Sequence, residues 1–488
     1  MQDDDESGVP TGGSREGAGS QLRLLEANSA SVFVRQLWLN IDPARTPPLS
    51  CYAWNLGISN DGVASLQEAP GCITEILSEA QMMELAAVYF AQVAPVYNFL
   101  DEQYVQGAIT RRWQTGACSM PADAMLCGVG ALGCLFGGRT TGTRIERRLV
   151  ESARSALEYS SSIASPRTEH VVGWLLRTIY LRATSSPQAT WMACCTLMHM
   201  IETTKLHLEP SDSWLLADGA DRTECDPELR RRIYWVSQLF NTWVSSDCGK
   251  SEVDLRGASS SLPGPSWTKE QQELCRISYA LGQTFEFHAT EIDAEMARLR
   301  ALSPDQPMLR LLQCNIGLCF FRRLRALGQT MTDSSLESLL DLAKESLAAV
   351  DVLVQVSCPW WHVINIPFQL VCVLLVVDTE AALGLLAEGL DVLKRVLERY
   401  STPTARETYD TARFLVTQER QRRSKRIEHL ATALQGHGPL PGLTGPEPLQ
   451  DAGQWQGFPD TPGLFDAELD LNGPLVDYFF FGHPFPQN

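Results

Sequence analysis

Residues 226–246 read DPELRRRIYWVSQLFNTWVSS and specify a helix more strongly than any other stretch of the chain. Asp226 suits the N-cap position, because its carboxylate can accept from the unpaired amides of the first turn, and Pro227 suits the first helical position, where no amide is needed. Arg231 falls roughly opposite an apolar stripe, so we expect one buried face and one solvated face. The stripe recurs at spacings of three and four and consists of Leu229, Ile233, Val236, Phe240 and Trp243.

The three arginines of this segment cannot all lie on one face of a helix. Arg230 and Arg232 must flank the apolar stripe, with their aliphatic stems on neighbouring elements and their guanidinium groups reaching carboxylates or backbone carbonyls. A contact with phosphate or nucleic acid is the alternative, but the preceding residues Asp221 and Glu224 are acidic. The pattern therefore favours a structural role for the arginines.

Four segments follow one another along the chain: Tyr89-Phe90 with Pro95, Tyr97 and Phe99-Leu100-Asp101; the arginine run with Tyr234 and Trp235, followed by Gly249-Lys250 and Leu262-Pro263; Pro359-Trp360-Trp361; and Ile366-Pro367-Phe368. Taken in this order, they resemble the regulatory region of fungal zinc-cluster transcription factors, and the resemblance covers about residues 78–400. Asn241 and Lys250-Ser251 depart from the family pattern.

The helical periodicity and the resemblance together imply an all-α protein with one large helical domain. Capping-box spacing at Ser78 and Gln81 marks the start of that domain, and Pro95 ends or kinks its first helix. The expected organisation is a Gly/Ser-rich acidic tail at 1–21, an N-terminal arm packed on the domain at 22–77, the helical regulatory domain at 78–430, a Gly/Pro linker at 431–464 and an acidic-aromatic segment at 465–488.

The overall charge excludes general nucleic-acid binding. The chain carries 40 Lys and Arg against 58 Asp and Glu, a net charge of −18, and so repels polyanions beyond the Debye length. The longest apolar run, residues 363–377, is shorter than the roughly twenty residues of a membrane-spanning helix. We therefore expect a buried core helix there, no membrane contact, and DNA contact only indirectly through a partner.

The motifs of common enzyme classes are absent from the 488 residues. They contain no Gly-x-Ser-x-Gly elbow, no His-Glu-x-x-His helix and no Gly-x-x-x-x-Gly-Lys-Ser/Thr phosphate loop. Gly128, Gly130 and Gly133 form a literal G-x-G-x-x-G, but no β-branched strand precedes it and a glycine-rich stretch follows it, so we interpret it as close helix packing. The 14 cysteines include no Cys-x-x-Cys pair and are expected to be mostly buried thiols. No catalytic residue, metal or cofactor is predicted.

The six-cysteine zinc module of the resembled family is missing from the sequence. The first cysteines are Cys51 and Cys72, and neither lies in a basic region. Autonomous sequence-specific DNA binding is therefore not expected. Either the module has been lost, or an upstream exon that encodes it lies outside this sequence.

Two segments are candidates for regulatory contacts. The basic run consists of Arg420, Arg422, Arg423, Lys425 and Arg426, which fits either a solvated helix surface or a nuclear-import segment. The acidic-aromatic segment includes Phe465, Asp466, Leu469, Asp470, Phe479 and Phe480, which is typical of activation segments that contact the transcription machinery, although a docked strand or helix is equally compatible.

A third candidate is the leucine stripe of residues 383–400. Its spacings of three and four resemble a short coiled-coil seam, but fewer than the three to four heptads needed are present. Packing within the chain is favoured over a dimer contact.

The resemblance implies a nuclear transcriptional regulator that controls a metabolic or secondary-metabolite gene set in a fungus. Its helical domain would serve regulation and dimerisation, with a second copy or a zinc-cluster factor as partner. The alternative is a helical enzyme or metabolite-binding protein that has kept the scaffold, which a closed pocket with polar groups of perturbed pKa would distinguish.

Overall fold

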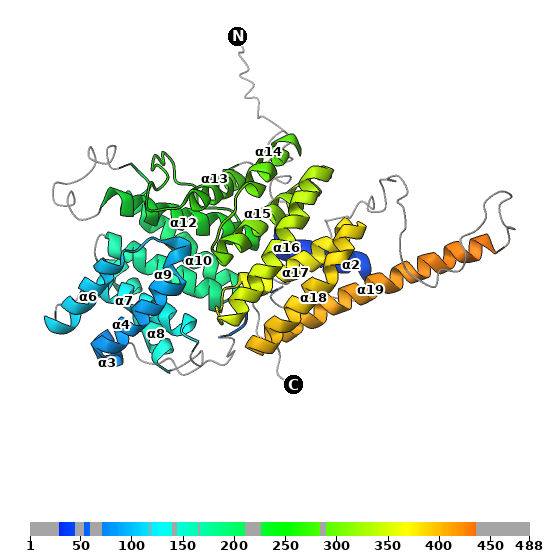
Figure 1. The fold of residues 1–488 in the computed structure, drawn as a ribbon. Coiled ribbons are helices and arrows are strands. Elements are labelled where there is room, and N and C mark those ends of the chain that lie inside the picture. Colours follow the sequence, from blue (N-terminus) through cyan, green and yellow to red (C-terminus); the bar gives the residue numbers. More distant parts are fainter. Residues whose placement is uncertain are drawn as a thin grey trace, which may run out of the picture. The chain divides into compact units, whose positions relative to one another are not determined.

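The computed structural model describes residues 29–43, 53–58, 71–116, 119–138, 144–163, 166–209, 226–283 and 289–435. Every regular element within these ranges is an α-helix (Figure 1), which confirms the expected all-α class. The chain divides into two compact units, residues 1–426 and 427–488.

The helices follow the hydrophobic periodicity of the sequence closely. In chain order they are α2 (Ala30–Ile41), α3 (Ile73–Ile76), α4 (Glu79–Gln92), α5 (Ala94–Tyr97), α6 (Glu102–Gln114), α7 (Met120–Phe136), α8 (Arg144–Ile163), α9 (Thr168–Thr184), α10 (Pro187–Thr203), α12 (Pro227–Cys248), α13 (Lys269–Gln283), α14 (Ala289–Arg300), α15 (Pro307–Ala326), α16 (Asp333–Gln355), α17 (His362–Val377), α18 (Glu380–Tyr400) and α19 (Pro403–Leu434).

Helix α12 links the two halves of the first unit. It packs against α2, α9 and α10 on one part of its surface and against α13 on another, and α13 in turn packs on α15 (Figure 1). Asp226 caps the helix as expected, because its side chain accepts from the Leu229 amide at 3.1 Å. The helix ends at Gly249, whose φ of 62° is a left-handed conformation that glycine adopts without strain.

The expectation that α12 has one solvated face is wrong. All residues from Arg232 to Thr242 are buried, including the polar ones, because neighbouring helices enclose the middle of α12. Two of these polar side chains are paired with the backbone. Asn241 exchanges hydrogen bonds of 2.9 and 3.0 Å with the backbone of Val253, and Ser237 donates to the Ile233 carbonyl at 2.8 Å.

The glycines of the G-x-G-x-x-G pattern lie inside helix α7 and are buried, as expected for close packing. A Cβ atom on Gly133 would lie 2.4 Å from the Leu85 carbonyl oxygen of α4, and one on Gly128 would lie 2.9 Å from Leu176 Cβ of α9. The glycines therefore let α7 approach two neighbouring helices.

Helices α17 and α18 contain the apolar run and the leucine stripe of the sequence. Helix α17 is buried along nearly its whole length although Pro367 lies inside it, so the apolar run is a core helix. Helix α18 packs on α16 and α17 and buries Gly389, Val392, Leu393 and Val396, so its stripe faces the chain's own core. None of the described helices is both long and apolar enough to cross a membrane.

Helix α19 differs from the expected organisation. We expected the helical domain to end at residue 430, but α19 continues to Leu434. Its last residues, IEHLATAL, contain neither glycine nor proline, so the helix has no reason to end before Leu434.

Candidate functional site

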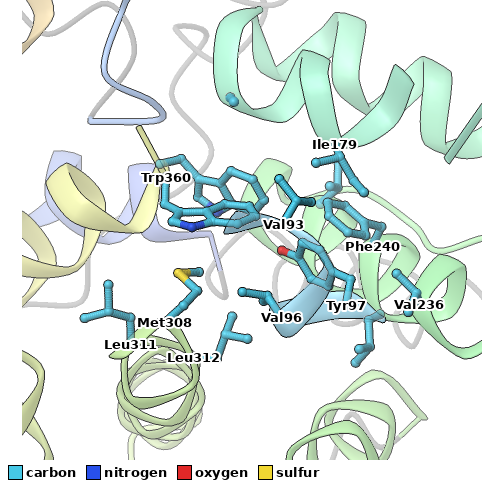
Figure 2. Packing of buried hydrophobic residues seen from close by; sticks show 14 of the residues in the cluster. Val93, Val96, Tyr97, Ile179, Val236, Phe240, Met308, Leu311, Leu312 and Trp360 are labelled. Atoms are coloured by element: carbon cyan, nitrogen blue, oxygen red, sulfur yellow. The ribbon is translucent and has the colours of Figure 1, made fainter. Parts of the chain in front are cut away.

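Three of the segments that carry the family resemblance meet in one aromatic cluster. Tyr97 of α5 lies 5.2 Å from Phe240 of α12 and 5.7 Å from Trp360, measured between ring centroids. Trp361 lies 6.0 Å from Phe240, and Phe136 of α7 lies 4.6 Å from Trp360. Figure 2 shows Tyr97, Phe240 and Trp360 gathered in the core. Segments far apart in the sequence thus form one junction around α12.

The three arginines hold three different parts of the chain to α12. Arg232 is buried and donates to Asp101 at 2.8 Å and to the Asn98 carbonyl at 3.2 Å. Arg230 donates to the Lys205 carbonyl at 3.0 Å, and Arg231 forms an ion pair with Glu209.

These contacts make the arginine run a structural clamp. Arg231 also lies 3.5 Å from the Glu228 carboxylate, and hydrogen bonding to Arg231 holds the pKa of Glu209 below its usual value. All three guanidinium groups therefore have protein partners, and the arrangement does not favour phosphate binding.

Tyr234 and Trp235 anchor the loop that follows α12. The Trp235 indole donates to the Ser261 carbonyl at 2.8 Å and meets the Tyr279 ring edge-on at 5.2 Å between centroids. Tyr234 packs against Trp235 at 5.4 Å, and burial raises the pKa of its hydroxyl. Both aromatic residues of the motif therefore make their contacts within the chain.

A buried ion pair at the end of α12 could not be predicted from the sequence. Arg182 of α9 is fully buried and donates to Asp247 at 3.1 Å and to the Trp54 carbonyl. Its guanidinium lies 3.6 Å from the centroid of the Trp54 ring and 4.8 Å from that of Trp361. The available signal was an arginine flanked by the apolar residues Tyr180, Leu181 and Ala183, since a buried arginine needs a partner.

This ion pair belongs to a polar network that docks residues 53–58. Arg322 donates to Gln369, Gln369 donates to Asn365, and Asn365 donates to the Ala53 carbonyl at 3.2 Å. The Trp54 indole donates to the Ser185 carbonyl at 3.0 Å. Because every link is buried or partly buried, this short N-terminal segment is integral to the core.

The basic run divides into two groups on α19. Arg422 and Arg423 each lie 3.0 Å from the Glu419 carboxylate, and Arg423 also pairs with Asp378 at 2.5 Å. Arg420, Lys425 and Arg426 are exposed. Only the second group presents its charges freely to solvent on this helix.

The remaining predictions concern the acidic-aromatic segment, metal ligands and the cysteine thiols. The acidic-aromatic residues from Phe465 to Phe480 lie outside the described residues. Over the part of the chain that the structure describes, no cluster of three His, Cys, Asp or Glu side chains could hold a metal ion. The thiols of Cys127, Cys194 and Cys275 are buried, and burial raises the pKa of each.

Comparison with known proteins places these features in context. Residues 87–270 match the model of the fungal specific transcription factor domain. The chain is 33% identical to "Protein RDR1" of Gibberella zeae over 425 residues, which are 86% of this chain and 77% of that protein. It is 33% identical to "Transcription factor kojR" of Aspergillus oryzae over 467 residues, 93% of this chain and 83% of that protein. A third relative, "Protein RDR1" of Saccharomyces cerevisiae, is 27% identical over 85% of this chain and 76% of its own length.

Proposed function

The chain belongs to the family of fungal transcription factors that share the fungal specific transcription factor domain, and from this premise we propose that it controls a metabolic or secondary-metabolite gene set. It is a transcriptional regulator and not an enzyme. The observation that supports a regulatory role for the helical domain is the junction around α12, where the family's segments are held together by Arg232 and the aromatic cluster.

The test of this function is the transcript profile of a deletion strain. Deletion should change the expression of a restricted, functionally related set of genes, and the wild-type chain should restore it. A restored strain that carries Arg232→Met should fail, because the clamp to Asp101 is lost, while Arg111→Met at an exposed position should succeed. A deletion that leaves every transcript unchanged under all growth conditions contradicts the proposal.

The proposal includes indirect contact with DNA. The 488 residues carry a net charge of −18 and no six-cysteine set, so recruitment by a DNA-binding partner accounts for promoter contact. The purified chain should shift promoter DNA at physiological salt only when nuclear extract from its own organism is added. Specific binding by the purified chain alone, or no binding in either case, contradicts this part of the proposal.

Nuclear localisation rests on the exposed part of the basic run. A fluorescent fusion should lose nuclear accumulation when Arg420, Lys425 and Arg426 are changed to alanine. The matched control changes Arg111, Lys269 and Lys344, which are also exposed, to alanine and removes the same amount of basic charge elsewhere. Equal nuclear signal in both variants refutes the import role.

The proposed function also includes pairing with a second copy of the chain or with a zinc-cluster factor. The leucines of α18 pack on the chain's own core, so they do not supply the contact. Ile427, Leu430 and Leu434 of α19 are 66%, 66% and 69% exposed and share one helical face through spacings of three and four. Leu430→Glu should abolish co-purification with the partner, and unchanged co-purification would exclude this face. Contact of residues 465–481 with the transcription machinery stays a prediction.

A further inference from the structure

The last turns of α19 carry the most exposed large apolar side chains among the described residues. Ile427, Leu430 and Leu434 are 66%, 66% and 69% exposed, whereas no other such side chain exceeds 57%. They share one side of the helix, because they follow one another at spacings of three and four. All residues from 424 to 435 are exposed, so no described element covers this stripe. An uncovered apolar stripe of this kind is typical of a contact surface.

Two exposed arginines belong to the same surface. Arg420 lies seven residues before Ile427 on one uninterrupted helix (Figure 1), and an α-helix drifts only about 20° over seven residues, so both lie on nearly the same side. Arg426 lies four residues before Leu430 and therefore borders the stripe. We call the three apolar residues and these two arginines the α19 face. A segment that fits this face combines large apolar side chains with carboxylates.

The acidic-aromatic segment has this combination in its sequence. Residues 465–481 contain four Asp and Glu residues, no lysine or arginine, and interleaved leucine and aromatic side chains. The other acidic end of the chain, residues 1–6, contains four Asp and Glu residues but neither leucine nor an aromatic residue. Charge alone fits both ends, and the apolar side chains select residues 465–481 as the occupant.

The chain between the α19 face and this segment is long enough to bring the two together. The 30 residues from 435 to 464 are rich in glycine and proline, and a flexible chain of that length has a root-mean-square span of about 30 Å. The α19 face extends over about 21 Å of helix from Arg420 to Leu434. A tether of this kind holds the segment at an effective concentration on the order of 1 mM.

The size of the α19 face favours a tethered segment over a second copy of the chain. A stable interface between separate proteins takes roughly 20–30 residues from each side. The α19 face offers three apolar side chains and two arginines, which are far fewer. A tethered segment needs less contact, because its binding takes place within one molecule. A separate partner has to displace the segment and add contacts of its own.

We propose that residues 465–481 dock on the α19 face of the same molecule. The leucine and aromatic side chains of the segment cover the apolar stripe, and its carboxylates pair with Arg420 and Arg426. The contact covers residues that the proposed function assigns to nuclear import and to pairing, so it restrains both until a competing partner displaces the segment. This regulatory consequence rests on the proposed function.

The test is limited proteolysis of the purified full chain with trypsin. Residues 427–488 contain no lysine or arginine, so cleavage after Arg426 releases them as one fragment that mass spectrometry quantifies. The combined variant Asp466→Asn, Glu468→Gln and Asp470→Asn should release this fragment about tenfold faster than the wild type, as expected for a segment of Kd about 0.1 mM held at about 1 mM. Release at the wild-type rate overturns the proposal.

The matched control removes the same charge from the other acidic end. The combined variant Asp3→Asn, Asp4→Asn and Asp5→Asn should release the fragment at the wild-type rate, with cleavage after the exposed Lys269 as the internal reference in every digest. Equal acceleration in this control means that net charge sets the rate, which overturns the proposal. Protection of the wild type should not depend on protein concentration. Protection that increases with concentration means that a second copy covers the face, which also overturns it.

A variant on the α19 face shows whether both sequences act on one contact. Leu430→Gln with Leu434→Gln changes exposed positions and keeps helix-forming residues, so the fold should persist. It should accelerate release about as much as the acidic-segment variant, and combining the two should add little, because both remove the same contact. Effects that multiply overturn the proposal. These digests involve neither import nor a partner, so their failure leaves the fluorescence and co-purification results unaffected, and the reverse also holds.

Discussion

Replacing Gly133 by alanine sets a methyl group against the backbone of a neighbouring helix. The added Cβ would lie 2.4 Å from the Leu85 carbonyl oxygen and 2.9 Å from Leu85 C and Cβ. The carbonyl belongs to helix α4 and cannot rotate away without breaking the helical hydrogen bonds. Relief therefore requires α4 and α7 to separate by roughly 0.6 to 1 Å, if the contact is to reach the normal carbon–oxygen distance.

Two opposing contributions set the size of the effect. Overpacking a core contact costs about 1–3 kcal/mol, and a clash with backbone belongs at the upper end of that range. Exchanging glycine for alanine inside a helix returns about 0.5–1 kcal/mol. The free energy of unfolding should therefore fall by about 2 kcal/mol.

The matched control is the same exchange in helix α6. Gly107 is exposed, and a Cβ there would meet nothing within 4 Å. Gly107→Ala should raise the free energy of unfolding by about 0.5–1 kcal/mol. Urea titrations followed by far-ultraviolet circular dichroism measure both variants. If Gly133→Ala is as stable as Gly107→Ala, then α7 does not pack on α4 as described, and the explanation of the glycine pattern is wrong.

Three further predictions address the capping, the ion pair and the pH dependence. Asp226→Ala should lower the free energy of unfolding by about 1 kcal/mol in urea titrations, because the Leu229 amide loses its cap. Arg182→Met should lower the free energy of unfolding by about 3–5 kcal/mol, because it leaves the Asp247 carboxylate unpaired. Adding Asp247→Asn should recover part of this loss. Equal stability of the single and the double variant would refute the ion pair between Arg182 and Asp247. Burial raises the pKa of Glu252 above its unfolded value of about 4.3, so between the unfolded and the folded pKa the folded state binds more protons. The free energy of unfolding should therefore fall as pH rises from about 4.3 through the folded pKa. Glu252→Gln should make this decrease shallower, and parallel pH profiles of variant and wild type would contradict the prediction.

The features that the sequence predicted well depend on residues within one or two helical turns. The capping box at Ser78 and the cap at Asp226 form as expected, because each joins a side chain to an amide three residues away. Helix α4 ends at Gln92 and Pro95 is the second residue of α5, for an equally local reason, since proline lacks the amide that would continue α4. Helix positions and most of the buried stripes therefore follow from local patterns.

The resemblance to a family identified the segments but not what they do together. Tyr97, Phe240 and Trp360 were recognised as parts of separate motifs, and only the structure brings them into one cluster. Likewise, the arginine run was expected to reach carboxylates or carbonyls, but Asp101, Lys205 and Glu209 could not be chosen from the many acids and carbonyls available.

What the sequence by itself determined is the all-α class, the starts of α4 and α12 and the inward direction of the apolar stripes of α12 and α18, because helical periodicity depends on neighbouring residues. Only the tertiary structure decided that α12 is enclosed on every side along its middle, and that Arg182 meets Asp247 across 65 residues and Trp54 across 128. A stripe predicts one buried face and says nothing about the opposite one. Whether that face is also covered, and which charge satisfies a buried partner, depends on helices brought together from distant parts of the chain.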